Sequence, residues 1–130
     1  MTEQRPLVVV ADDEKDILLL VATVLRNAGF DVIGARDGAE ALMEIRFRRP
    51  QLAILDLSMP ELDGLEVLRR IRADPDLAKL PIVILSARAQ EADMALGYAE
   101  GASKYVRKPF KPRELAALAL ELVQSAPEGR

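Results

Sequence analysis

Cysteine and histidine are both absent from this chain of 130 residues, and aromatic residues make up only 4% of it. Without cysteine there can be no disulfide, no thiolate metal site and no cysteine nucleophile. Without histidine the chain lacks the commonest general base, the Ser-His-Asp arrangement of hydrolases and any phosphohistidine of its own. Zinc is disfavoured for the same reasons, so a metal bound here should be a hard cation held by oxygen ligands.

An excess of positive charge is also lacking, because the net charge is −3 and the isoelectric point is near 5.1. Surfaces that bind nucleic acid are usually basic and carry aromatic side chains on which bases stack. The arginine clusters at residues 46–49 and 69–72 are therefore interpreted as solvated helix ends. We expect no direct binding of nucleic acid by this chain.

Long hydrophobic segments are missing as well. The longest apolar run, Ile17–Val24, is interrupted by Thr23 and is too short to span a bilayer. The amino-terminal residues 1–6 lack the apolar segment of a signal peptide. We therefore expect a cytoplasmic protein that does not contact membranes. The length suits one domain, predicted over residues 7–124, with a tail at 1–6 and a tail or the start of a linker at 125–130.

What the chain does contain is a regular alternation of short apolar runs and helical patterns. Strands are predicted at residues 7–11, 31–35, 51–55, 81–85 and 103–106. Helices are predicted at residues 17–28, from 38 to before Pro50, at 64–73 and 90–99, and from Pro112 onward. Strands that alternate with helices in this way favour parallel βαβ units and one sheet covered by helices on both faces. The predicted fold class is α/β.

Polar side chains follow four of the five predicted strands. Asp12 and Asp13 follow the first strand, Asp56 the third, Ser86 the fourth and Lys108 the fifth. Taken singly, each is an ordinary turn residue or helix cap. In a parallel sheet, however, all strands end at one edge, and ligands bind at that edge. We therefore expect three carboxylates, a hydroxyl and an ammonium group to lie together.

Three carboxylates at close quarters repel one another, by about 4 kcal/mol per pair at ~4 Å and an effective dielectric near 20. Either one takes up a proton or a cation sits among them. Mg²⁺ suits such a site, because it takes one or two carboxylates together with water and phosphate oxygens. An aspartate can also act as a nucleophile that forms an acyl phosphate. Lys108 and Ser86 would contact the oxygens of the transferred group. The set predicts Mg²⁺-assisted phosphoryl transfer onto Asp56.

The chain closely resembles the response-regulator receiver family of two-component signalling over about residues 7–124. The matching residues are Asp12-Asp13, Asp56 with Met59-Pro60 and Asp63-Gly64, Ser86-Ala87, Gly101-Ala102, Tyr105 and Lys108-Pro109-Phe110. The resemblance implies a flavodoxin-like, doubly wound sheet of strand order 2-1-3-4-5. It also implies phosphorylation of Asp56 by a histidine kinase or a histidine phosphotransfer protein, in a regulator that is not a turnover enzyme.

The resemblance assigns further roles. Mg²⁺, with Mn²⁺ as a substitute, would be held by Asp13, Asp56 and the backbone carbonyl of Ser58, with Asp12 acting mostly through water. Lys108 would pair with the phosphoryl group, and the Lys108-Pro109 bond would be cis. Ser86 and Tyr105 would form a switch that remodels the fourth helix, fifth strand and fifth helix for an unknown output partner. Ser58 and Arg88 would border the path of the hydrolytic water, and Arg88 is expected to slow the loss of phosphate.

The first helix carries a further expectation. Its core face is predicted to consist of Ile17, Leu20, Val21, Val24, Leu25 and Ala28. Leu18, Leu19 and Ala22 lie off that face in this pattern, and in the family a kinase docks there, so we expect them to bind the kinase. Lys104 stands where dimerising winged-helix regulators usually carry an acid. We therefore expect a monomer or a weak dimer.

Three other classes of protein share some of these features. A phosphorylation-independent binding module with the same fold would have lost the switch, yet all five site residues are present. A haloacid-dehalogenase-type phosphatase needs a second aspartate two residues after its acceptor, where this chain has Ser58. A flavodoxin-like binder of small molecules needs a phosphate-binding loop after the first strand, where Asp12 and Asp13 would repel the ligand.

Overall fold

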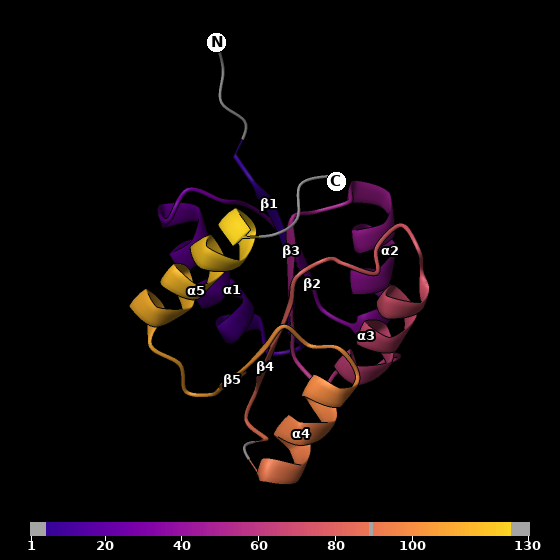
Figure 1. Cartoon of the computed structure of the whole chain (residues 1–130). Helices are drawn as coiled ribbons and strands as arrows, with labels where there is room; N and C mark the ends of the chain where they lie inside the picture. Colours follow the sequence, from indigo (N-terminus) through magenta and orange to yellow (C-terminus); the bar gives the residue numbers. More distant parts are fainter. Residues whose placement is uncertain (1–4, 89, 126–130) are drawn as a thin grey trace.

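The structure is a computed structural model that describes residues 5–88 and 90–125 (Figure 1). In these residues five strands alternate with five helices, each close to its predicted position. The elements in chain order are β1 (Leu7–Ala11), α1 (Lys15–Asn27), β2 (Asp31–Ala35), α2 (Gly38–Arg48), β3 (Leu52–Leu55), α3 (Gly64–Ala73), β4 (Ile82–Ser86), α4 (Glu91–Ala99), β5 (Lys104–Arg107) and α5 (Pro112–Ser125).

The five strands form one parallel sheet in the order β2-β1-β3-β4-β5, as predicted. Figure 1 shows α1 and α5 on one side of the sheet, with α2 and α3 on the other and α4 beside the β5 edge. The central strand β1 contributes alternate residues to two cores: Val8 and Val10 pack with α1 and α5, and Val9 and Ala11 pack with α2 and α3. Burial on both faces explains why the strands are apolar without interruption.

Two helices on the second face start at aspartate caps that fix their position. The side chain of Asp37 accepts a hydrogen bond from the Glu40 amide at 2.7 Å, and Asp63 does the same for the Glu66 amide at 2.9 Å. A Cβ added at Gly64 would lie 2.1 Å from the carbonyl oxygen of Asp56. Glycine at this position therefore lets the start of α3 pack directly against the end of β3.

Helix α1 buries most of the predicted face, but this face is rotated so that Leu20 lies outside it. The buried residues of α1 are Val21, Ala22 and Leu25, with Ile17 and Ala28 packed beside them, and Ala22 is only 6% exposed. Leu18 is half-buried over Gly34 of β2, whereas Leu20 is 44% exposed. The expectations that Ala22 and Leu18 are exposed and that Leu20 belongs to the core are therefore wrong. Because α1 packs against both β2 and α5, its buried face is rotated toward β2.

Arg5 and Pro6, before β1, form hydrogen bonds with the end of α1 and the start of β2. The Arg5 guanidinium donates to the carbonyl oxygens of Arg26 and Phe30 at 2.8 and 3.0 Å, and the Pro6 carbonyl accepts from the Asp31 amide. The rest of the expected tails, residues 1–4 and 126–130, lies outside the described residues. Among the helices that the structure describes, none has the length and apolar character needed to cross a bilayer.

Candidate functional site

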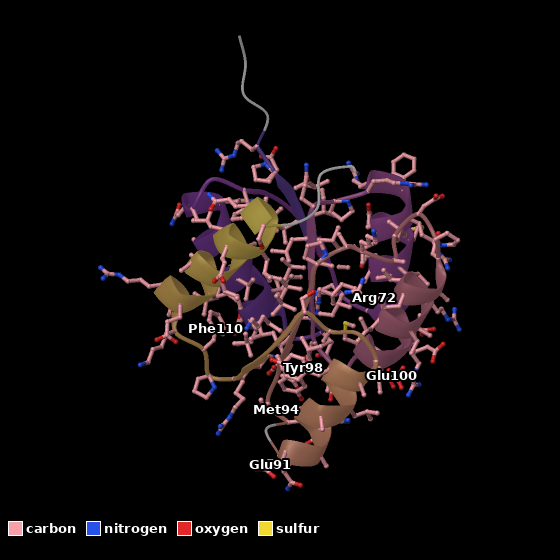
Figure 2. The ribbon with its side chains drawn as sticks, in the orientation of Figure 1. Arg72, Glu91, Met94, Tyr98, Glu100 and Phe110 are labelled. Atoms are coloured by element: carbon pink, nitrogen blue, oxygen red, sulfur yellow. The ribbon has the colours of Figure 1, made fainter. Side chains whose placement is uncertain are left out.

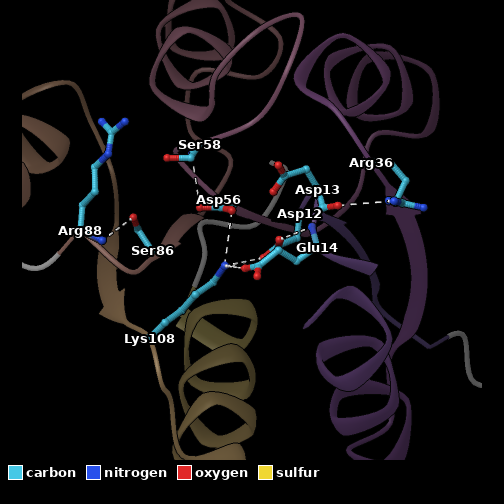
Figure 3. A network of polar contacts seen from close by, with 9 residues as sticks. All are labelled: Asp12, Asp13, Glu14, Arg36, Asp56, Ser58, Ser86, Arg88 and Lys108. Atoms are coloured by element: carbon cyan, nitrogen blue, oxygen red, sulfur yellow. Dashed lines mark hydrogen bonds and ion pairs between the residues drawn. The ribbon is translucent and has the colours of Figure 1, made fainter. Parts of the chain in front are cut away.

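The structure brings the five predicted site residues together at the carboxyl edge of the sheet (Figure 3). Asp12 and Asp13 directly follow β1, Asp56 follows β3, Ser86 is the last residue of β4, and Lys108 follows β5. The carboxylates of Asp12, Asp13 and Asp56 each offer an oxygen, and these oxygens lie within 4.8 Å of one another. The convergence expected from the parallel topology is confirmed.

The ammonium group of Lys108 lies among carboxylates. Its Nζ is 2.8 Å from Oδ2 of Asp12, 3.3 Å from Oδ2 of Asp56 and 3.4 Å from Oε1 of Glu14. Asp12 and Asp56 are buried, whereas Glu14 is exposed. Glu14 was not among the site residues predicted from the sequence. Its place directly after Asp12-Asp13 was the available signal, but at the start of a helix an acidic residue is ordinary.

The pKa values of Asp56 and Lys108 both lie above their ordinary values, for different reasons. Burial and the charge of Asp12 raise the pKa of Asp56, while the Lys108 cation and the hydrogen bond from the Ser58 amide oppose this rise. Burial lowers the pKa of Lys108, but its hydrogen bond to Asp12 and the charge of Asp56 outweigh burial, so this pKa lies above its ordinary value. Lys108 therefore remains a cation at neutral pH.

One ammonium group does not balance the three carboxylates at this edge. Asp13 is exposed, and its backbone carbonyl accepts from the guanidinium of Arg36 at 3.4 Å. The excess negative charge and the all-oxygen donor set suit a hard divalent cation such as Mg²⁺. The residues present therefore fit the expected metal.

Two short hydrogen-bonded turns flank the carboxylate of Asp56. The Ser58 amide donates to Oδ1 of Asp56 at 3.3 Å, which keeps the Ser58 backbone beside the carboxylate. On the neighbouring strand, the buried hydroxyl of Ser86 accepts from the Arg88 amide at 3.0 Å. The side chain of Arg88 is exposed and forms no ion pair with any residue that the structure describes.

Tyr105 lies inward in this structure and joins the site to α4. Its ring is 7% exposed, and its hydroxyl donates to the carbonyl of Arg88 at 2.7 Å. Its amide donates to the hydroxyl of Tyr98 at 3.0 Å. A Cβ at Gly97 would lie 3.0 Å from the Tyr105 ring, so glycine leaves room for the ring. A chain of hydrogen bonds thus runs from Ser86 through Arg88 and Tyr105 to Tyr98 on α4.

The peptide bond between Lys108 and Pro109 is cis, as the resemblance implied. Tyr98 and Gly97 were not identified as part of this region from the sequence. A tyrosine on a helix gives no signal that its hydroxyl accepts a hydrogen bond from the edge strand of a sheet.

The class of protein follows from the fold and these five residues. The family model of the response regulator receiver domain matches residues 8–120, and the chain belongs to this family. The DNA-binding response regulator MtrA of Mycolicibacterium smegmatis is 42% identical over 117 residues, which cover 90% of this chain and 50% of MtrA. The alkaline phosphatase synthesis transcriptional regulatory protein PhoP of Bacillus subtilis is 42% identical over 110 residues, 85% of this chain and 45% of PhoP.

The chain thus spans about half the length of the curated relatives it matches. Among solved structures, the receiver domain of the Francisella response regulator 1452 superposes with a TM-score of 0.86 at 34% identity, covering 92% of this chain and 97% of that domain. The chemotaxis protein CheY4 of Vibrio cholerae gives a TM-score of 0.85 at 29% identity, with 92% and 99% covered. The predicted family and fold are confirmed.

Proposed function

We propose that this receiver domain accepts a phosphoryl group on Asp56 in a Mg²⁺-dependent reaction. The observation that carries the proposal is the placement of the Asp56 carboxylate at the sheet edge. It lies 3.3 Å from the ammonium group of Lys108, beside the oxygens of Asp12 and Asp13. A buried nucleophile, an anionic metal-binding pair and a fixed cation are the parts that phosphoryl transfer onto a carboxylate requires.

In the proposed reaction, a carboxylate oxygen of Asp56 forms a bond to the phosphorus of the donor. The bond from phosphorus to the donor atom breaks, and its electron pair leaves with that atom. Mg²⁺, held by Asp12, Asp13, Asp56 and the backbone carbonyl of Ser58, would neutralise charge on the phosphoryl oxygens. Lys108 exchanges its contact with Asp56 for a phosphoryl oxygen, and the hydroxyl of Ser86 turns to donate to another.

The proposed partners are a histidine kinase or a histidine phosphotransfer protein on the input side and an unidentified output partner or domain. On α1, Leu19 is 61% exposed and Leu20 is 44% exposed, so these two leucines form the apolar surface offered to the kinase. On the output side, a phosphoryl group that draws Ser86 would disturb the hydrogen bonds through Arg88 and Tyr105. The surface formed by α4, β5 and α5 therefore carries the signal.

Intact mass spectrometry after incubation with acetyl phosphate tests this function. The wild-type chain should gain one phosphoryl group with Mg²⁺ and much less with EDTA. Asp56→Asn should gain none. The matched control is Asp76→Asn, because Asp76 is an exposed carboxylate in an ion pair with Arg49, away from the site. No gain by the wild-type chain, under conditions that label a known receiver, would contradict the proposal and favour a phosphorylation-independent module.

A further inference from the structure

A surface groove lies between α2 and α3, away from the proposed phosphorylation site. It has a volume of about 520 Å³, and its lining includes Met43, Arg46, Phe47, Glu61, Leu62 and Arg70. Phe47 is 79% exposed and Met43 is 60% exposed. They are one helical turn apart and point to the same side of α2. Two adjacent apolar side chains at this exposure give one side of the groove an apolar character.

The lining of this groove has a small excess of positive charge, with two arginines and one acidic residue, whereas the net charge of the chain is −3. The other arginines of residues 38–49 and 64–73 do not line the groove, and three of them pair with carboxylates of the same chain. Arg70 pairs with Glu66 at 3.1 Å, but Arg46 makes no ion pair with any residue in the described part of the chain. Glu61 is the one acidic residue that lines the groove. The groove is therefore suited to an apolar segment that carries negative charge.

Helix α4 of the same chain has that chemistry. It contains Glu91 and Asp93 but no basic residue, whereas Glu100, after its last turn, already pairs with Arg69 of α3 at 3.1 Å. Figure 2 shows Glu91 and Glu100 at opposite ends of the helix. Its outer face is apolar, because Leu96 is 45% exposed and residues 92, 95 and 99 are exposed alanines. Small side chains let another helix approach closely. Nine residues make a helix about 14 Å long, close to the length of α2.

We propose that helix α4 of one copy of this chain docks into the α2–α3 groove of a second copy. Leu96 would pack against Phe47 and Met43, and the acidic residues of α4 would face the arginines of the groove. The contact joins two different surfaces, so it is heterologous. In a pair, the copy that contributes α4 keeps its groove free, and the other copy keeps its α4 free. Such contacts build chains or rings instead of symmetric dimers. The interface is small, so the association should be weak and concentration-dependent. Both surfaces are those of the unphosphorylated chain, so the contact does not rest on the proposed function of Asp56.

Complementation between two variants tests this arrangement by sedimentation equilibrium. The wild-type chain should rise above its monomer mass of 14.3 kDa as its concentration increases from micromolar to millimolar. Phe47→Ser and Leu96→Ser should each weaken self-association roughly thirtyfold, as expected for a central interface residue. Their equimolar mixture should form a one-to-one dimer, because the first variant keeps α4 and the second keeps the groove. Lys79→Ser, at an exposed residue after α3 that does not line the groove, is the control and should associate like the wild type.

Crosslinking distinguishes this contact from a symmetric one. Because the chain has no cysteine, Phe47→Cys and Leu96→Cys each introduce a single thiol. A short bis-maleimide should link the two variants mainly to each other when they are mixed. Dimers of Phe47→Cys alone at equal yield would indicate a symmetric contact between two α2 helices and overturn the proposal. It would also be overturned by a wild-type chain that stays monomeric, or by a mixture of serine variants that behaves as the separate variants do.

Discussion

At the scale of single residues, the position that suits Asp56 to accept a phosphoryl group also lowers the free energy of unfolding. Its carboxylate is 5% exposed, and burial and Asp12 together raise its pKa above the ordinary value of 3.8. A raised pKa means that the folded state disfavours the ionised carboxylate relative to the unfolded state. The contacts with Lys108 and Ser58 offset this effect only in part. The functional group therefore destabilises the fold at neutral pH.

Asp56→Asn should consequently stabilise the metal-free protein. Asparagine keeps the acceptor for the Ser58 amide and removes the repulsion with Asp12, and we expect a gain of about 1–2 kcal/mol in the free energy of unfolding at pH 7. The gain should shrink as the pH falls through the raised pKa of Asp56 and vanish below 3.8, where the carboxylate is protonated in both states. Urea unfolding in EDTA at several pH values measures it. A loss of stability at pH 7, or a gain that grows in acid, would contradict this account.

At the scale of elements, a side-chain hydrogen bond helps to join α4 to the edge of the sheet. β5 is the edge strand, and the Tyr105 amide donates outward to the hydroxyl of Tyr98 at 3.0 Å. Removing an acceptor from a half-buried amide costs about 1 kcal/mol. We therefore expect Tyr98→Phe to lower the free energy of unfolding by about that amount and to speed hydrogen exchange of the Tyr105 amide.

Tyr105→Phe is the matched comparison, because it removes a different hydroxyl from the same contact region. It keeps the amide of residue 105 bonded to Tyr98 and loses only the bond to the Arg88 carbonyl. Exchange at the amide of residue 105 should therefore stay slow in this variant. Equal exchange rates in the two variants, followed by NMR, would show that the Tyr98 hydroxyl does not hold α4 on β5.

The elements themselves were predictable because their signals are local. The apolar run at residues 7–11 and the glycine that starts α3 are read within a few residues of sequence. The buried face of α1 was not predictable in the same way. Leu18 and Leu20 are both leucines, and only the position of Gly34 on a neighbouring strand decides that Leu18 packs inward. Periodicity indicates that a helix has a buried face, but the packing partners set its orientation.

Some residues of the site could likewise be predicted from the sequence, and others could not. Asp12, Asp56 and Lys108 were predicted because a parallel topology brings strand ends together whatever the side chains are. Tyr98 could not be predicted, because its role depends on the distance between its hydroxyl and one backbone amide. Contacts of that kind require coordinates.

At the scale of the whole molecule, metal binding at the carboxyl ends of the strands should change the free energy of unfolding of the whole chain. The three carboxylates come from the ends of β1 and β3, two central strands whose separation abolishes the site. Mg²⁺ should therefore bind the folded chain and not the unfolded one. A ligand with that preference raises the free energy of unfolding by about 2.7 kcal/mol at one hundred times its dissociation constant.

Thermal unfolding with increasing Mg²⁺ should accordingly show a midpoint that rises by several degrees in the wild-type chain. Asp13→Asn removes an exposed carboxylate. The unfolding midpoint of this variant in EDTA should therefore stay close to that of the wild type. The rise of the midpoint with Mg²⁺ should be lost. Asp76→Asn removes an equally exposed carboxylate elsewhere and should keep the full rise. The carboxylates of Asp12, Asp13 and Asp56 repel one another in the absence of metal. If the unfolding midpoint of the wild-type chain did not change with Mg²⁺, Lys108 alone would balance these charges. The proposed role of Mg²⁺ in holding the phosphoryl group would then be contradicted.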